Sequence, residues 1–412
     1  MFMTATNVFN ISELKTNSLI KKNLDNKKFS LQFLAQSLES FSKQKNFFYK
    51  EQKLKTAYII DILHNLILKY YFKKENKFHL HSCILKEKYG YLYNYYINFL
   101  IENKILILLA KHQKGKTTRI YAINEYILRG NIIRYHNYDK VLLKKHKNKI
   151  IQTDNENGRI SLIDSDIKAK LVEDLFKVDI QFDRSIFYLD STKSDIDVYN
   201  KNRYSVECIK DGHIFYHFDN FGRMHTNFTI LKSAIRKNCL QIDGEETTEL
   251  DISNSQPLFL TKLIHDSDTK WVNSDEYELF KYLTINGYFY KYLMDKLEIK
   301  DKGLIKEFTY KVLFGRNASN SKADKEFSKI FPTIHNFIKL YKKEHGDYRI
   351  IAYDLQKSES NLIFNKIIRQ IMTLHPDVCL ITVHDSIIIK KSCYDIIYPI
   401  FKTKLYEEFG LI

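Results

Sequence analysis

The 412-residue sequence lacks any pair of cysteines at Cys-x-x-Cys spacing, and its five cysteines are scattered along the chain. This pattern indicates neither a zinc site nor a disulfide framework, and it favours a reducing compartment. No apolar run approaches the length of a membrane span, and the N-terminus lacks the pattern of a signal peptide. We therefore expect a cytoplasmic protein that has no membrane partner.

What the sequence has in excess is positive charge and aromatic side chains. Its formal net charge is +16 and its pI is near 9.2, which argues for a polyanionic partner. The 29 tyrosines and 28 phenylalanines are often interleaved with lysine, a mixture suited to stacking on bases and neutralising phosphates. The alternative is compositional, because an AT-rich genome enriches Lys, Asn, Ile, Tyr and Phe without any function.

The residues Thr382-Val383-His384-Asp385-Ser386 lie between two short apolar runs that are rich in β-branched side chains. Such a pattern predicts a β-hairpin with a carboxylate at its tip. A carboxylate in that place would be held rigidly and would face solvent or a ligand. The alternative is a hairpin whose turn uses Asp only for its turn chemistry.

A second aspartate has a similar setting much earlier in the chain. Asp251 follows a predicted turn at residues 243–245 and precedes the apolar residues that begin at Leu258. Two carboxylates, one ending a strand and the other on a neighbouring hairpin, can hold two divalent metals about 3.5–4 Å apart. Mg²⁺ suits such a site because it prefers oxygen ligands together with substrate phosphates.

The clearest local pattern in the first half follows a predicted amphipathic helix at 51–72. Two short helices are predicted at 78–89 and 91–103, and then two strands at 104–109 and 119–123 with a basic turn between them. This order resembles a winged-helix module that binds duplex DNA. The residues expected to contact phosphates are Lys111, Lys114, Lys116 and Arg119. The alternative is a winged helix used only for packing or protein contacts.

The remainder of the first half gives weaker signals. Residues 1–50 are polar and rich in Lys and Asn, with weak helical periodicity, and we expect a mobile or helical extension. A helix is predicted near 167–176, and a polar linker is predicted at 153–158. The basic run at 140–149 is either a solvated face or a grip on a nucleic-acid backbone.

The stretch that precedes Gly315 is predicted to form a helix that ends at this glycine. Lys302, Lys306, Tyr310 and Phe314 recur every four residues, which keeps their side chains on one face. Two lysines followed by two aromatics on one stripe would suit the phosphates, sugar and base of a nucleoside triphosphate. The alternative is a surface helix with two lysines lying along apolar surface and two aromatics in the core.

Two further residues are candidates for contact with nucleic acid. Arg223 follows a glycine turn and would suit a phosphate. Gln356 starts a predicted helix and could donate a hydrogen bond in a minor groove, or it could be an ordinary exposed helix-start residue. The apolar face of that helix carries Leu362, Ile363, Ile367, Ile368 and Ile371.

Together these segments resemble the palm and fingers of family A DNA polymerases, which are related to single-subunit phage-type RNA polymerases. Gly222-Arg223-Met224-His225-Thr226 resembles the family's GRxHT segment, and Asp251-Ile252-Ser253 is similar to motif A. The helix from Lys306 to Gly315 looks like motif B, with Lys302 where the family usually has Arg. Gln356-Lys357-Ser358 resembles the family's Gln-Gly-Ser/Thr helix, and Val383-His384-Asp385 matches motif C.

The resemblance implies nucleotidyl transfer with two Mg²⁺ ions, or Mn²⁺ in their place. Asp251 and Asp385 would hold the ions together with the backbone carbonyl of Ile252. Lys306 would neutralise phosphate charge and protonate the pyrophosphate leaving group. The residues implied to contact the incoming nucleotide are Lys302, Tyr310, Phe314, Gly315 and Gln256. Those implied to hold the primer–template are Arg223, His225, Gln356 and His384.

The departures from the family pattern bear on the choice of sugar. Gln256 stands where the family's DNA polymerases have a Glu that excludes the ribose 2′-hydroxyl, and Ser386 is closer to the RNA polymerase branch. Phe314, which lacks the tyrosine hydroxyl of the RNA branch, favours deoxynucleotides. No acidic exonuclease motif set precedes the palm-like region, so we expect no proofreading.

The sequence therefore predicts an α+β protein in four parts. These are a polar extension at 1–50, a winged-helix-like domain at 51–130, a linker or thumb-like region at 131–217, and a right-hand polymerase palm with antiparallel sheet and helical fingers at 218–412. We expect a compact DNA polymerase of a plasmid, phage or other mobile element, in a bacterial or virus-infected host cell, that is recruited to origin DNA. The alternatives are a primase or RNA polymerase that uses NTPs, and a non-catalytic replication initiator.

Overall fold

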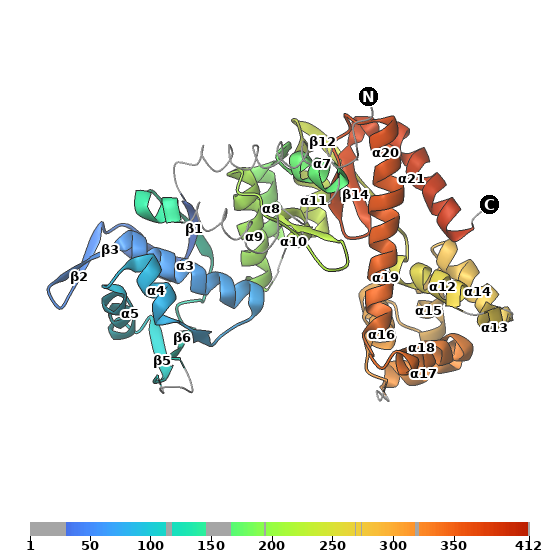
Figure 1. The fold of residues 1–412 in the computed structure, drawn as a ribbon, viewed down its shortest axis with the longest axis horizontal. Coiled ribbons are helices and arrows are strands. Elements are labelled where there is room, and N and C mark those ends of the chain that lie inside the picture. Colours follow the sequence, from blue (N-terminus) through green and yellow to red (C-terminus); the bar gives the residue numbers. More distant parts are fainter. Residues whose placement is uncertain are drawn as a thin grey trace, which may run out of the picture. The chain divides into compact units, whose positions relative to one another are not determined.

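The computed structural model describes residues 30–112, 118–145, 166–192, 195–267, 269–272, 274–317 and 321–410. The chain divides into two compact units. The first unit comprises Met1–Phe215 and Thr226–Gly244, and the second comprises Tyr216–His225 and Glu245–Ile412 (Figure 1). The four segments predicted from the sequence stay a prediction, and residues 226–244 belong to the first unit.

The fold is mixed α+β with antiparallel strands, which confirms the predicted fold class. The strands of the first unit are β1 (Ser30–Ala35), β2 (Asn46–Tyr49), β3 (Gln52–Lys55), β4 (Phe78–His79), β5 (Leu106–Ala110), β6 (Ile120–Ile123), β7 (Ile132–Asn137), β8 (Val178–Ile180) and β11 (Leu240–Ile242). Its helices are α2 (Glu39–Ser42), α3 (Thr56–Lys73), α4 (Ser82–Tyr89), α5 (Tyr93–Glu102), α7 (Asp166–Leu175), α8 (Phe182–Ser191), α9 (Ile196–Lys210), α10 (Asn227–Ile230) and α11 (Ser233–Cys239).

The expectation of a mobile or helical extension at residues 1–50 is wrong for residues 30–35 and 46–49, which form strands, while residues 36–42 are helical. Residues 30–35 form β1, which pairs antiparallel with β7, and Phe33 and Leu34 lie in the core. The sequence misled because this strand is buried on both faces and therefore shows no apolar–polar alternation. The helix predicted from residue 51 is present, but it begins at Thr56 because residues 52–55 form a hairpin with β2.

A buried carboxylate ties the N-terminal strand to the helices behind it. Asp61 on α3 is fully buried, and it accepts hydrogen bonds from Gln32 on β1 at 2.6 Å and from Tyr89 on α4 at 2.5 Å. Lys88 adds an ion pair to Asp61 at 2.6 Å. A buried charge is stable only when it is paired and hydrogen-bonded in this way. Residues 30–35 are therefore part of the core of the first unit.

The elements predicted for the winged-helix module are present in the expected order. Helices α4 and α5 are joined at Gly90, which adopts a φ of 75°, and they are followed by the β5–β6 hairpin. Strand β4 pairs with β6 and completes a three-stranded antiparallel sheet. The aromatic and aliphatic side chains of α5, including Tyr96, Phe99 and Leu100, are buried in the core of the unit.

The structure also describes residues from two other predictions for the first half of the chain. The helix predicted near 167–176 is confirmed as α7. In the basic run at 140–149, the described residue Lys145 donates hydrogen bonds to the carbonyls of Glu87 and Lys88, at 2.7 and 2.9 Å, near the end of α4. At least this lysine has a structural role. The linker predicted at 153–158 lies outside the described residues.

The second unit combines short antiparallel strands with a larger set of helices. Its strands are β9 (Tyr216–Phe218), β10 (Met224–Thr226), β12 (Glu245–Asp251), β13 (Ile381–Val383) and β14 (Ser386–Lys390). Its helices are α12 (Ser255–Ser267), α13 (Thr269–Val272), α14 (Asp275–Ile285), α15 (Phe289–Leu297), α16 (Lys302–Phe314), α17 (Lys322–Ile330), α18 (Pro332–Glu344), α19 (Ile350–Ser360), α20 (Arg369–Leu374) and α21 (Tyr394–Phe409).

Helices α19 and α20 are continuous through a π-helical segment, Asn361–Ile368, and form one long rod (Figure 1). The helix predicted to start near Gln356 is present, but it begins at Ile350. The prediction took the polar residues around Gln356 for the start of the helix, and they lie inside it. The five aliphatic side chains of its predicted apolar face are all buried. No helix in the described part of the chain is long and apolar enough to cross a membrane.

Candidate active site

The predicted hairpin around Asp385 is confirmed. Strands β13 and β14 pair antiparallel with Val383 opposite Ser386, which leaves His384 and Asp385 as the two residues of the connection. His384 adopts a φ of 53°, a left-handed conformation that a non-glycine residue seldom adopts. Its side chain is exposed and that of Asp385 is half-buried. A tight turn between two buried strands holds the carboxylate at a fixed place.

Strand β12 brings Asp251 to the same place. It pairs antiparallel with β14, and Asp251 is the partner of Ser386, the residue that follows Asp385. The backbone N–H of Ile252 donates to the carbonyl of Asp385 at 3.3 Å, which ties the end of β12 to the hairpin. Two aspartates that are far apart in sequence therefore lie at adjacent strand ends, as the sequence predicted.

This pair of carboxylates suits divalent metal ions that take some of their ligands from the protein and the others from a substrate. The side chain of Asp251 is exposed, and within the described part of the chain no side chain makes an ion pair or hydrogen bond with the Asp385 carboxylate. Among those same residues, no three His, Cys, Asp or Glu side chains are grouped so that they could hold a metal alone. Mg²⁺ commonly uses one or two carboxylates and completes its shell with water and phosphate oxygens. Ile252 has a buried apolar side chain, so only its backbone carbonyl is available as a ligand.

A buried glutamate beside this pair was not singled out from the sequence. Glu359 on α19 is only 1% exposed. Its carboxylate forms an ion pair with Arg223 at 2.7 Å and accepts hydrogen bonds from Gln256 at 2.9 Å and Ser255 at 3.3 Å. The sequence signal was its helical spacing from buried residues, since Leu355 and Leu362 lie four positions before it and three after it.

The ionisation of Glu359 depends on its burial and on the charges of Arg223 and Asp385. Burial raises the pKa of Glu359 to about 7, the cation of Arg223 lowers it, and the negative charge of Asp385 raises it. Glu359 also accepts hydrogen bonds from Ser255 and Gln256 at the start of α12. These bonds join α19 to the segment that lies four to five residues after Asp251.

The hairpin of β9 and β10 carries Arg223 and His225. Its loop is organised by Asp219, whose carboxylate accepts backbone N–H groups from Phe221 at 2.9 Å and Arg223 at 3.0 Å, and contacts His225 at 2.9 Å. Burial would raise the pKa of Asp219, but these hydrogen bonds outweigh it and lower the pKa. The ring of His225 lies 6.0 Å from that of His384, so both histidines lie at the hairpin of Asp385.

Arg223 has an internal partner in this structure. It was predicted to hold nucleic acid, but its guanidinium is mostly buried and pairs with Glu359. Gln356, predicted to contact a minor groove, lies on α19 one turn before Glu359 and is half-buried. The helix therefore presents a polar residue at the surface and a carboxylate in the interior.

The predicted stripe on α16 is present and faces outward. Asp301 caps the helix by accepting the N–H groups of Gly303 and Leu304. The side chains of Lys302 and Lys306 are exposed, and that of Tyr310 is 40% exposed. The alternative that placed both aromatics in the core is therefore wrong for Tyr310.

Tyr290 on α15 connects this stripe to Asp385. The ammonium of Lys306 lies 5.7 Å from the centre of the Tyr290 ring, and the neighbouring Tyr310 contributes, after burial, to the raised pKa of Tyr290. Burial raises the pKa of both tyrosines, and the charge of Asp385 raises both further. The ring of Phe314 lies 5.6 Å from that of Tyr310. Lysine, aromatic rings and carboxylate thus belong to one neighbourhood.

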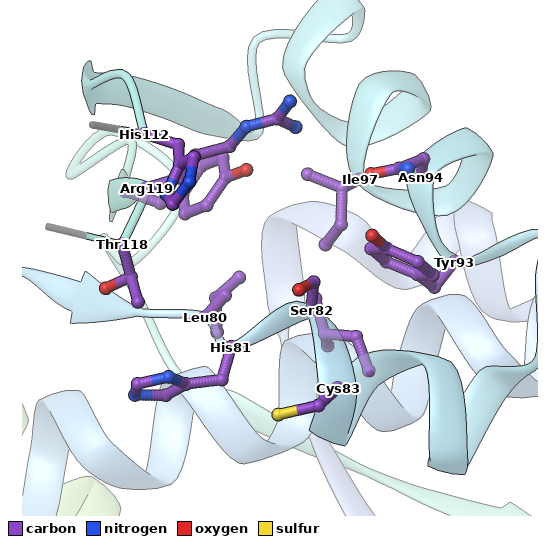
Figure 2. A pocket seen from close by; sticks show the side chains of 12 residues that line it. Leu80, His81, Ser82, Cys83, Tyr93, Asn94, Ile97, His112, Thr118 and Arg119 are labelled. Atoms are coloured by element: carbon purple, nitrogen blue, oxygen red, sulfur yellow. The ribbon is translucent and has the colours of Figure 1, made fainter. Parts of the chain in front are cut away.

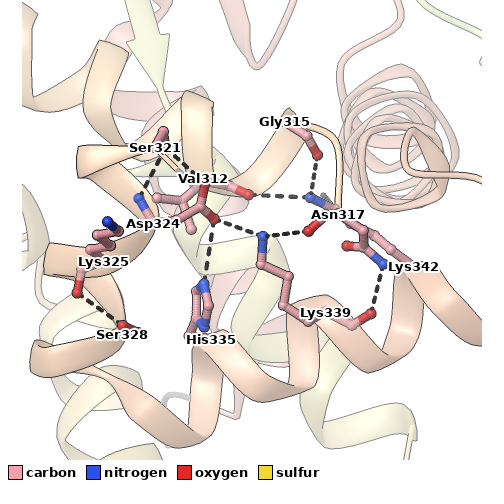
Figure 3. A network of polar contacts seen from close by, with 10 residues as sticks. All are labelled: Val312, Gly315, Asn317, Ser321, Asp324, Lys325, Ser328, His335, Lys339 and Lys342. Atoms are coloured by element: carbon pink, nitrogen blue, oxygen red, sulfur yellow. Dashed lines mark hydrogen bonds and ion pairs between the residues drawn. The ribbon is translucent and has the colours of Figure 1, made fainter. Parts of the chain in front are cut away.

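The C-terminal end of α16 is held by a buried lysine (Figure 3). Lys342 on α18 is 1% exposed, and its Nζ donates to the carbonyls of Val312 at 3.2 Å and Gly315 at 2.9 Å. Burial lowers the pKa of Lys342 to about 8. Gly315 has no room for a side chain, since an added Cβ would lie 2.3 Å from the carbonyl oxygen of Lys311.

A second lysine completes this network. Lys339 forms an ion pair with the buried carboxylate of Asp324 at 2.8 Å, and its Nζ donates to the carbonyl of Asn317 at 3.3 Å. The amide of Asn317 donates in return to the carbonyl of Lys339 at 3.0 Å. The segment that follows Phe314 is therefore fastened to α18 on both sides of Gly315.

The structure describes two of the four residues predicted to contact phosphates in the first unit. Lys111 and Arg119 are exposed, while Lys114 and Lys116 lie outside the described residues. Arg119 also lines a cavity of about 240 Å³, together with His81, the residue before α4, and Asn94 in the first turn of α5 (Figure 2). The residues that line the cavity come from the wing and from the two helices of the module.

Comparison with known proteins gave no family model that matches the chain and no curated protein that matches it.

Proposed function

We propose that the chain is a template-directed nucleotidyltransferase, and in particular a DNA polymerase that extends a primer 3′-hydroxyl. The observation that carries the proposal is the meeting of Asp251 and Asp385 at adjacent strand ends, next to a helix that presents lysines and aromatic rings to solvent. This combination suits a substrate that brings phosphates, a sugar and a base to two carboxylates.

Asp251 and Asp385 would hold two Mg²⁺ ions, which supply charge stabilisation for the attacking and leaving oxygens of phosphoryl transfer. Lys306, an exposed cation, would bind the triphosphate and donate a proton to the departing pyrophosphate. Tyr310 would stack on the incoming base, and Phe314 would lie against the sugar and the templating base. Lys302, one turn before Lys306, would extend the phosphate contact.

The remaining residues would orient the nucleic acid. His225 and His384, whose rings are neighbours, would contact the primer strand near its end. Gln356 would reach the minor groove from α19. We assign Arg223 a positioning role in addition, since it neutralises Glu359 and so fixes the start of α12 behind Asp251.

Use of NTPs by a primase or RNA polymerase is the second candidate. Ser386 and Gln256 had suggested NTP use, and in the structure each has a contact within the protein that accounts for its presence. The hydroxyl of Ser386 lies 2.7 Å from the carboxylate of Glu249 and 2.9 Å from the carbonyl of Val383, and can donate its one proton to either acceptor inside the sheet. The amide of Gln256 is held by Glu359. Because both side chains are held by contacts within the protein, neither is free to select the sugar by itself, and we favour dNTPs.

The test is extension of a labelled primer on a DNA template with Mg²⁺, with dNTPs and NTPs supplied separately. Asp251→Asn and Asp385→Asn should each lower kcat by about 10³-fold, because metal-bound charge stabilisation contributes several kcal/mol. Asp377→Asn, an exposed carboxylate of the same unit, should leave the rate unchanged.

The possible outcomes separate the candidates. Extension with dNTPs that is lost in both aspartate variants supports the DNA polymerase. Extension only with NTPs moves the protein to the primase class. Absence of extension with either substrate, on primed and unprimed templates, would leave a non-catalytic DNA-binding initiator as the function.

A further inference from the structure

A series of alternating rings and guanidinium groups lies on the second unit, outside the residues assigned above. In order, its members are Phe221, Tyr353, Arg349, Tyr348 and Arg316, and we call this series the ring–guanidinium ladder. Phe221 and Tyr353 are stacked with ring centres 5.0 Å apart. Arg349 lies 5.4 Å from the Tyr353 ring and 5.9 Å from the Tyr348 ring, and Arg316 lies 5.7 Å from Tyr348.

The ladder faces solvent through its central and outer members. Tyr348 is 37% exposed, Arg349 and Arg316 are exposed, and Phe221 and Tyr353 are half-buried. The two guanidinium groups approach Tyr348 only at the outer limit of a cation–π contact, which is about 6 Å. Tyr348 therefore keeps solvent-exposed surface beside both groups. Exposed aromatic surface that is not covered by neighbouring side chains is available to a planar partner.

The two arginines differ in how their charge is balanced. Arg349 makes two parallel contacts with Asp347, both at 3.1 Å, which fix the plane of its guanidinium. Arg316 has no ion pair within the described part of the chain. The ladder thus offers flat surfaces held in place at its centre and an unneutralised cation at one end. Flat groups next to a positive charge suit bases joined by phosphates.

Both ends of the ladder begin in segments of the candidate active site. Phe221 lies two residues before Arg223, which pairs with Glu359. Arg316 follows Gly315, whose carbonyl is held by Lys342 at the end of α16. A strand lying along the ladder would therefore run between the loop of the β9–β10 hairpin and the end of the α16 stripe.

We propose that the ring–guanidinium ladder binds the unpaired part of a nucleic-acid strand, with successive bases stacked on its rings and guanidinium planes. The partner is single-stranded because base faces are available only where no complementary strand covers them. This inference rests on the proposed function in one respect, since that function makes the strand the unpaired template next to the site.

The experiment measures binding of the full chain to labelled oligothymidine by fluorescence anisotropy, with a duplex of equal length as reference. Tyr348→Leu should weaken single-strand binding by roughly 5- to 150-fold, the range for removal of one stacked base, with little effect on the duplex. It should leave the salt dependence unchanged, because no charge is removed. Arg316→Gln should lower the slope of log affinity against log salt by about 0.7.

A control variant is available in the same unit. Tyr282 is 57% exposed, and its ring neighbour is Tyr288 rather than a guanidinium group. Tyr282→Leu should leave oligothymidine affinity unchanged. Unchanged affinity in Tyr348→Leu, or an equal loss in Tyr282→Leu, would overturn the ladder.

The binding measurement needs no turnover, so its result is separable from that of the proposed function. If the wild type binds oligothymidine through the ladder but extends no primer, the ladder stands and the polymerase fails. If both hold, Tyr348→Leu should raise KM for templates with a long unpaired overhang more than for templates with a short one, at unchanged kcat. A KM that rises equally for both template types would overturn the placing of the template on the ladder.

Discussion

The side-chain amide of Gln256 donates a hydrogen bond to the buried carboxylate of Glu359 at 2.9 Å. This contact joins the helix that follows Asp251 to the helix that carries Gln356. Glu359 also pairs with Arg223 on the β9–β10 hairpin. A residue that the sequence left without a role is thus the centre to which three segments of the candidate active site are attached.

The ionisation of Glu359 should make stability depend on pH. Its pKa is raised from an ordinary value of 4.5 to about 7, chiefly by burial. The folded state therefore favours the protonated carboxyl, so this contribution is complete below pH 4.5 and is lost as pH rises through 7. We expect Glu359→Gln to match the wild type at pH 4.5 and to gain on it by up to about 3 kcal/mol at pH 8. Denaturant unfolding in metal-free buffer measures this, and a constant difference between pH 4.5 and 8 would contradict it.

Gly315 should be intolerant of any side chain. An added Cβ would lie 2.3 Å from the backbone oxygen of Lys311, which cannot move without distorting α16. We expect Gly315→Ala to cost about 1–3 kcal/mol of unfolding free energy and to reduce activity. Gly303→Ala on the first turn of the same helix is the control, since its Cβ meets only a side-chain oxygen of Asp301, at 3.0 Å. Its effect should stay below about 1 kcal/mol, and equal losses in the two variants would refute the explanation.

Lys342 should determine the mobility of the end of α16. Lys342→Met keeps the aliphatic stem but leaves the carbonyls of Val312 and Gly315 without their buried donor, a loss of about 1–3 kcal/mol. Hydrogen exchange in residues 312–317 should accelerate by about tenfold or more. Lys343→Met, at the exposed neighbouring position, should leave these rates unchanged. Equal exchange in wild type and Lys342→Met would show that the lysine does not anchor this segment.

The wing of the first unit is best tested by point substitutions, because residues 30–35 belong to the core and a truncation would unfold it. We expect Lys111→Ala combined with Arg119→Ala to weaken duplex DNA binding. The slope of log affinity against log salt should fall by about 0.9 for each phosphate that the variant no longer neutralises. Lys50→Ala combined with Lys53→Ala, two exposed lysines outside the wing, is the control. Duplex affinity that is insensitive to the wing substitutions would favour the packing role.

Local patterns in the sequence determined much of this protein. Two β-branched runs around His384 and Asp385 allowed little but a hairpin, and the four-residue spacing from Lys302 to Phe314 required one helical face. Both follow from short-range backbone geometry, in which side-chain direction repeats with the period of the element. The order of helices and strands in the winged-helix module was predictable for the same reason.

Other features were decided only by the tertiary structure. The prediction failed at residues 30–35, because a strand buried on both faces lacks the apolar–polar alternation that identifies a half-buried strand. Lys342 gave no local signal, and Glu359 gave only a helical spacing from buried leucines, because what distinguishes both residues is burial against segments far away in the chain. Which carboxylates, cations and rings meet depends on long-range packing that no short stretch encodes, and that packing placed Asp251 beside Asp385 and made Glu359 the link between their supports.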